Sequence, residues 1–306
     1  MINTLNGIND AVKKDAASFI RSCEKEYGDQ IVSLAKKISD NDDIKIVAIA
    51  GPSASGKTTT AHILMRELER LGETTAVISL DDFYLPLDKL PRNSDGSRDI
   101  ESVAAMDTER IKRAFKDIID TGEAYLPEFN FLTKSRKENA KKITIGQRGI
   151  AIVEGLHAMN PKITDLVPHK NILKVYISVN VSVVDDNGER VMSSRQVRLV
   201  RRLLRDERFR GADPVETLGL WNNVVAGESR FLYCFKDTAD VKLTTLHPYE
   251  LCVYKDLFCK MRNGVDRDVP GYDYFMRSQD AVEKFVSAKS ELVPENSLIR
   301  EFIGGK

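Results

Sequence analysis

The chain lacks an excess of charge of either sign. It has 306 residues, with 46 Lys and Arg against 46 Asp and Glu, so its formal net charge is zero. This balance gives no support to binding of nucleic acid or of an anionic membrane surface. No apolar stretch approaches membrane-spanning length, and the first residues lack the basic and apolar regions of a signal peptide. We therefore expect a cytoplasmic protein with no nucleic-acid or membrane partner.

Cysteine is also scarce. Four residues, Cys23, Cys234, Cys252 and Cys259, form no C-x-x-C pair and have no histidine at metal-ligand spacing. We expect buried thiols in a reducing compartment. Internal repeats and low-complexity segments are absent as well, and the hydrophobic content of 42% is ordinary for a globular protein with a sizeable core.

The most specific pattern present is GPSASGKT at residues 51–58, which matches the phosphate-binding loop G-x-x-x-x-G-K-[ST]. An apolar run at 44–50 predicts a buried strand before it, and 58–71 predicts an amphipathic helix after it. The pattern can arise by chance in an ordinary turn, but the strand and the helix favour a true phosphate site, with backbone N–H groups and the helix dipole facing the anion.

The loop predicts a bound nucleoside triphosphate, ATP or GTP. Lys57 is placed to reach the outer phosphates, and the Thr58 hydroxyl to ligate Mg²⁺. The nucleotide-binding residues that we expect are Gly51, Ser53, Ala54, Ser55, Gly56, Lys57, Thr58 and Thr59.

The rest of the chain alternates between strands and helices. Residues 1–42 predict an N-terminal helical arm, packed on the core or on a partner subunit, and 43–306 predict one domain that contains the phosphate-binding loop. Further strands are predicted at 74–80, 150–154, 172–178 and 241–244, helices at 107–120 and 195–206, and a hairpin from 141 to 154. Thr108 is a candidate N-cap. This order predicts an α/β fold with a mostly parallel sheet flanked by helices.

Acidic residues stand where two of these strands end. Asp81 and Asp82 follow the second strand, and Glu154 ends the strand at 150–154. Open α/β sheets bind ligands at this edge. Such acids are often solvated turn residues, but phosphoryl transfer needs both a metal ligand and a base, which they supply. We expect Glu154 to bind Mg²⁺ together with Thr58.

A very basic segment runs from 195 to 211. Its arginines 198, 201, 202 and 205 recur at helical spacing, and Gly211 ends the segment. A solvated basic face or a nucleic-acid site are the ordinary explanations. In a phosphotransferase, an arginine-rich lid over the phosphates explains the pattern better, since guanidinium groups stabilise the charge that develops in transfer. We expect Arg205 and Arg210 to be catalytic.

Together these motifs resemble the uridine kinase and phosphoribulokinase family of P-loop kinases. The resemblance rests on the loop at 51–58, on SLDDFY at 79–84, on PEFNFLTKSR at 127–136, on VEG at 153–155 and on the arginine segment; the ending at 293–305 is similar to a bacterial nucleoside kinase group. It implies a P-loop NTPase fold and Mg²⁺-dependent phosphorylation of a primary hydroxyl, most simply the 5′-hydroxyl of a nucleoside, often by a homo-oligomer.

By position, the resemblance makes Asp81 the catalytic base and a substrate contact. It places Tyr84 near the acceptor sugar, Arg136 near its hydroxyls or the phosphates, and Arg201 among the substrate-binding residues.

The chain departs from the family at the segment that reads the pyrimidine base. Phe129, Asn130 and Lys134 stand where uridine kinases usually carry Tyr, Asp and His. A phenyl ring stacks but has no hydroxyl, and a lysine donates hydrogen bonds without accepting them. We expect Phe129 and Lys134 to contact an acceptor other than the usual pyrimidine nucleosides. A kinase of another small polyol or sugar, and a nucleotide-binding regulatory protein, remain as alternatives.

Overall fold

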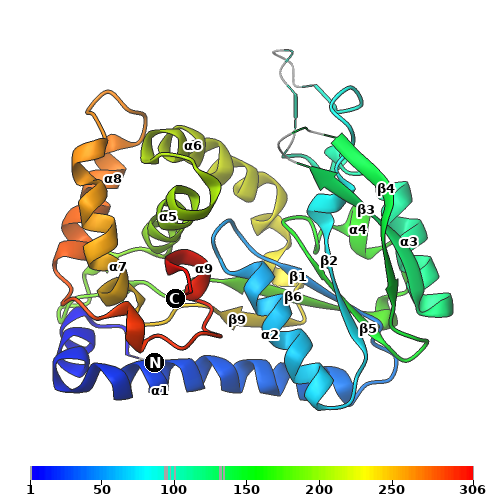
Figure 1. The fold of residues 1–306 in the computed structure, drawn as a ribbon, viewed down its shortest axis with the longest axis horizontal. Coiled ribbons are helices and arrows are strands. Elements are labelled where there is room, and N and C mark those ends of the chain that lie inside the picture. Colours follow the sequence, from blue (N-terminus) through cyan, green and yellow to red (C-terminus); the bar gives the residue numbers. More distant parts are fainter. Residues whose placement is uncertain are drawn as a thin grey trace.

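The computed structural model describes residues 2–92, 96, 98–99, 101–130, 133 and 135–305. Within them, five parallel strands form the central sheet in the order β2-β5-β1-β6-β9 (Figure 1). Their bounds are β1 Ile46–Ala50, β2 Thr75–Ser79, β5 Ile150–Glu154, β6 Ile172–Ser178 and β9 Val241–Thr244. The parallel α/β fold predicted from the sequence is therefore confirmed.

Helices cover both faces of this sheet. They are α1 Leu5–Ser39, α2 Lys57–Arg70, α3 Thr108–Thr121, α4 Pro161–Thr164, α5 Ser194–Arg205, α6 Pro214–Phe231, α7 Glu250–Cys259, α8 Tyr272–Glu283 and α9 Arg300–Ile303. Two small antiparallel strand pairs lie outside the central sheet: β3 Glu123–Asn130 with β4 Ser135–Thr144, and β7 Val183–Val184 with β8 Arg190–Met192. None of the helices in the described part of the chain is long and apolar enough to cross a membrane.

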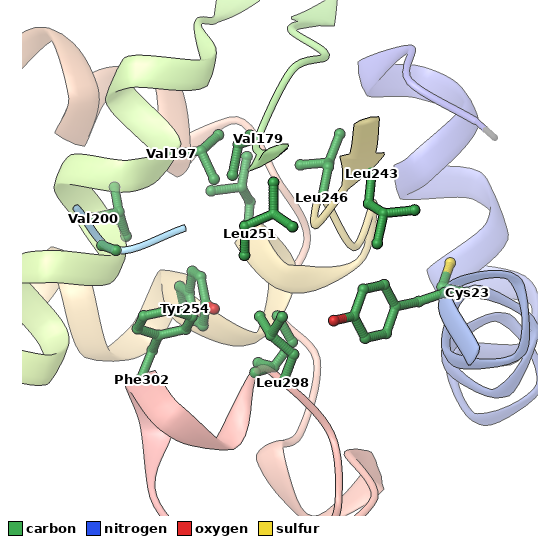
Figure 2. Packing of buried hydrophobic residues seen from close by; sticks show 14 of the residues in the cluster. Cys23, Val179, Val197, Val200, Leu243, Leu246, Leu251, Tyr254, Leu298 and Phe302 are labelled. Carbon is green, nitrogen blue, oxygen red and sulfur yellow. The ribbon is translucent and has the colours of Figure 1, made fainter. Parts of the chain in front are cut away.

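Side chains that alternate along each strand divide the core into two layers, one on each face of the sheet. In β1, Ile46, Ala48 and Ala50 face the layer that includes α3, whereas Val47 and Ile49 face the layer that includes α1, α2, α5 and α7. Successive side chains of a strand point to opposite faces, so an all-apolar strand between two parallel neighbours needs helices on both sides. The second layer also takes up the chain's last residues, as Figure 2 shows for Leu298 and Phe302.

The N-terminal helix packs on this core. Thr4 caps α1, and the helix runs along the lower edge of the molecule in Figure 1. Its buried positions include Ile20, Tyr27, Ile31 and Leu34, which join the same apolar layer as α2 and α7. Of the two placements predicted for the arm, the core is therefore the one seen within this chain.

Three local predictions are corrected. The hairpin predicted at 141–154 is wrong: β4 pairs with β3, and β5 joins the parallel sheet between β1 and β2. Charged residues fill β4 but β5 is wholly buried, so the two segments suit different sheets. The N-cap of α3 is Asp107, which accepts from the Arg110 N–H, and not Thr108. Among the cysteines, Cys234 is exposed.

The basic helix forms as predicted, but most of it is not a lid. The apolar side of α5, including Val197, Val200 and Leu204, is buried in the core. A π-helical turn continues it from Asp206 to Arg210, and Gly211 ends that turn with a φ of 65°. The arginine-rich lid stays a prediction.

Replacing Ile31 by alanine should destabilise the fold by about 2–5 kcal/mol, the usual cost of a cavity at a buried aliphatic position. Ile31 is 0% exposed, whereas its neighbour Val32 is 37% exposed. Val32→Ala is the matched control and should cost less than about 1 kcal/mol. Urea unfolding measures both. Equal small losses would show that the helix is not part of the cooperative core.

Candidate active site

The phosphate-binding loop lies between β1 and α2. Gly56 adopts a left-handed conformation, with φ of 85°, immediately before Lys57 starts the helix. Gly51 approaches β6 so closely that a Cβ atom there would lie 2.4 Å from the Ile177 carbonyl oxygen. Only glycine fits both positions without strain, which is why the motif has glycine at its two ends.

Two buried arginines of α5 support the loop from outside. Arg198 donates to the Ser53 carbonyl at 3.0 Å, and Arg201 donates to the Ala54 carbonyl at 3.3 Å. When a loop turns its N–H groups toward an anion, its carbonyls point away and need other partners. Each guanidinium is itself neutralised by a buried carboxylate: Arg198 by Glu228 at 2.7 Å, and Arg201 by Glu250 at 2.6 Å.

The prediction that Arg201 binds substrate is therefore wrong. Arg201 is fully buried, and its guanidinium also donates to the Thr245 carbonyl, so it cannot bind substrate as predicted. Arg136 is likewise absent from the cavity lining. It pairs with Asp107 at 2.9 Å and donates to the Tyr84 carbonyl at 3.4 Å, which makes it a support for Tyr84.

A cavity of about 680 Å³ opens above the loop. Its size suits a nucleotide and a small acceptor. It brings together the following predicted residues: Ser53, Ala54, Gly56, Lys57, Thr58, Asp81, Tyr84, Phe129, Glu154, Arg205 and Arg210. Gly51, Ser55 and Thr59 belong to the loop and its helix but do not line the cavity, and Lys134 lies outside the described residues.

The ends of β2 and β5 meet beside the loop. Ser79 and Glu154 are register partners, and the Ser79 hydroxyl donates to Glu154 at 2.9 Å. The Thr58 hydroxyl lies 3.4 Å from the same carboxylate oxygen. A hydroxyl and a carboxylate side by side are oxygen ligands of the kind that Mg²⁺ prefers, with phosphates and water completing its coordination. The donor set therefore fits the predicted metal.

The two adjacent aspartates, Asp81 and Asp82, have different surroundings. Asp82 turns away from the cavity and accepts from the Phe129 N–H at 3.3 Å. Asp81 lines the cavity and is open to solvent there, although protein surrounds it on most sides. This burial raises the pKa of Asp81, while the positive charges of Lys57 and Arg210 act against the rise. Burial lowers the pKa of Lys57 in turn, and the charge of Glu154 opposes that shift.

One buried acid, Asp206, lies close to three of the arginines that line the cavity. Asp206 lies 3.2 Å from Arg202, 3.1 Å from Arg205 and 3.5 Å from Arg210. Because guanidinium groups repel one another, a shared carboxylate lets three of them point toward one cavity. Such a cluster suits the charge of a triphosphate.

Aromatic and aliphatic groups form another part of the cavity wall. The rings of Tyr84 and Phe129 lie 5.8 Å apart between centroids, tilted by 56°. Leu85, Leu87 and Leu156 also line the cavity. This wall suits a flat or apolar part of the acceptor.

Sequence reasoning missed several lining residues: Leu85, Leu87, Leu90, Arg98, Glu101, Leu156, Arg202, Val224, Glu228 and Glu301. Arg202 had a signal, because it belongs to the basic helix. Glu228 and Glu301 had none, since Glu228 lies far along the chain from Ser53 of the loop, and Glu301 lies far from Thr59 of α2.

Comparisons with known proteins agree with this geometry. A model of the Phosphoribulokinase / Uridine kinase family matches residues 46–250. Uridine-cytidine kinase B of Dictyostelium discoideum is 28% identical over 166 residues, which make up 54% of this chain and 60% of that protein. Uridine kinase of Macrococcus caseolyticus is 26% identical over 198 residues, covering 64% of this chain and 85% of that protein.

Among solved structures, a possible uridine kinase from Bacillus stearothermophilus covers 70% of this chain and 97% of its own, at 18% identity and a TM-score of 0.49. The fold assignment rests on the order of the parallel strands, β2-β5-β1-β6-β9. The family match, in contrast, runs through more than half of the chain, from β1 to the start of α7, and takes in the loop, both acidic strand ends and the arginine helix. The chain therefore belongs to the Phosphoribulokinase / Uridine kinase family and is a P-loop phosphotransferase.

Proposed function

We propose that the protein transfers the γ-phosphoryl group of ATP or GTP to the 5′-hydroxyl of a nucleoside. The observation that carries this proposal is that Asp81 shares one cavity with Lys57 of the phosphate-binding loop and with the Tyr84–Phe129 pair. The uridine kinases that the chain resembles support the same class of acceptor. The apolar wall favours a nucleoside base over a polyol, because a polyol has no flat face to stack.

In the proposed reaction, the acceptor hydroxyl lies between Asp81 and the γ-phosphate. Asp81 accepts the hydroxyl proton as the oxygen attacks phosphorus, and the bond from phosphorus to the β–γ bridging oxygen breaks to release the nucleoside diphosphate. Lys57, Arg205 and Arg210 stabilise the negative charge that spreads over the phosphoryl oxygens.

Thr58 and Glu154 would hold the Mg²⁺ ion that accompanies the nucleotide. When bound, this ion neutralises phosphate charge. Ser79 keeps the Glu154 carboxylate in place through its 2.9 Å hydrogen bond. Burial raises the pKa of Glu154, and the charge of Lys57 acts against this rise, so a bound cation favours the ionised form further.

The direct test is release of ADP from Mg·ATP against a panel of nucleosides and small sugars. We expect release that depends on a nucleoside. Uridine and cytidine should be poorer acceptors than the best nucleoside, since Phe129 lacks the tyrosine hydroxyl. Lys57→Ala is the control and should lower turnover at least about 100-fold. Release that only sugars stimulate, or that no acceptor stimulates, would contradict the proposal.

Asp81→Asn should lower kcat by about two to four orders of magnitude, the usual contribution of a positioned general base, while nucleotide affinity changes little. Because burial raises the pKa of Asp81 from 3.8, its ionised form is complete only at a higher pH than for an ordinary aspartate. When kcat/KM is measured against pH, its fall at low pH should therefore occur at a higher pH than an ordinary aspartate would give. The Asp81→Asn variant should not show this fall. Steady-state kinetics of Asp82→Asn supply the control. If Asp82→Asn is crippled and Asp81→Asn is not, the base has been misassigned.

Glu154→Gln should raise the Mg²⁺ concentration for half-maximal activity by about tenfold or more, since an amide is a weaker cation ligand than a carboxylate. Titrating MgCl₂ at saturating nucleotide and acceptor measures the effect, and part of the lost activity should return at high Mg²⁺. A lower kcat with unchanged Mg²⁺ dependence would remove Glu154 from the metal site.

A further inference from the structure

The C-terminal segment 290–305 lies outside the region that the family model matches, yet it packs against the phosphate-binding loop. Leu298 is fully buried beside Gly56, where an added Cβ atom would lie 2.6 Å from its Cδ1 atom. The Phe302 ring lies 5.0 Å from the Arg201 guanidinium carbon. Figure 2 shows Leu298 and Phe302 in the same packed layer as Tyr254. The segment thus forms part of the wall behind the loop.

One arginine holds this segment in a compact shape. The Arg300 guanidinium donates to the carbonyls of Ser290, Val293, Pro294 and Gly304, at 3.1, 2.5, 3.3 and 2.9 Å. Four contacts from one side chain close the segment on itself. The next residue, Glu301, is therefore presented from a built support and not from a loose end.

Glu301 extends from this support to the cavity. Its Oε2 atom accepts from the Thr59 hydroxyl at 2.6 Å, and its Oε1 atom lies 3.6 Å from Nη1 of Arg205. It also lines the cavity. One carboxylate therefore connects the first turn of α2 with an arginine that points toward the phosphate site.

The N-terminal arm holds the same turn from the neighbouring residue. The Tyr27 hydroxyl lies 2.8 Å from the Thr60 hydroxyl, and both are buried. The Ser297 hydroxyl in turn donates to Glu24 of the arm at 2.6 Å. The two extensions on either side of the matched region thus meet each other and contact consecutive residues of α2.

We propose that Glu301 is a positioning residue that acts through Arg205. A free arginine side chain has many rotamers, and ordering it at the moment of reaction costs conformational entropy. A carboxylate fixed on the tail, together with Asp206 at 3.1 Å, orders the guanidinium beforehand. This inference rests on the proposed function in one respect, that Arg205 contacts the transferring phosphoryl group.

A double-mutant cycle tests the proposal. The affinity of the protein for Mg²⁺, ADP and fluoroaluminate, which together mimic the transferring phosphoryl group, is measured by calorimetry for the parent, Glu301→Gln, Arg205→Ala and the double variant. Glu301→Gln should weaken this complex about tenfold in the parent but less than about twofold in the Arg205→Ala background. Binding of ADP alone should change little in all four proteins.

Glu295→Gln is the matched control, because Glu295 is an exposed acid of the same segment. It should bind like the parent. Equal losses from Glu301→Gln in both backgrounds, or a loss that follows a lower melting temperature, would overturn the proposal. If the parent phosphorylates an acceptor but the cycle is additive, this inference is refuted and the proposed function is not. If the cycle is coupled but the protein phosphorylates no acceptor, the proposed function is refuted and this inference is not.

Discussion

The hydrogen bonds from two buried arginines to the back of the phosphate-binding loop are the constraint on which the site depends. Arg198 and Arg201 donate to the consecutive carbonyls of Ser53 and Ala54. With these carbonyls engaged, the loop can keep its N–H groups toward the cavity. Removing one partner of such a buried pair typically costs about 3–5 kcal/mol, because a charge is left uncompensated. Glu228 and Glu250 are therefore as much a part of the loop's geometry as its glycines.

The cavity is organised by a balance of opposite charges. Lys57 and the three arginines around Asp206 face Asp81, Glu154, Glu228 and Glu301. Each of these cations has an acid near it, which limits their mutual repulsion. A triphosphate with its metal ion matches this arrangement, since the anion meets the arginines while the cation meets Glu154.

The two extensions outside the family match pack against the start of α2. The N-terminal arm contributes Tyr27, and the C-terminal tail contributes Leu298 and Glu301, to the neighbourhood of α2. Both belong to the apolar layer on one face of the sheet. Because the phosphate-binding loop opens into α2, ordering the start of this helix also orders the loop. The arm and the tail are thereby connected to the phosphate-binding loop through α2.

The elements whose signal is local could be predicted from the sequence. The glycine loop, the apolar strand before it, the amphipathic helix after it, and the acids at the ends of β2 and β5 are all patterns within short windows. Of their residues, Lys57, Thr58, Asp81 and Glu154 line one cavity. The basic helix was also visible from its spacing, but the spacing did not show which arginines face inward. The packing of the folded chain determines that Arg201 is buried while Arg205 lines the cavity, that β4 pairs with β3, and that Glu301 contacts Thr59 across 242 positions of sequence. Contacts of that range depend on how whole elements pack, and no local period or motif records them.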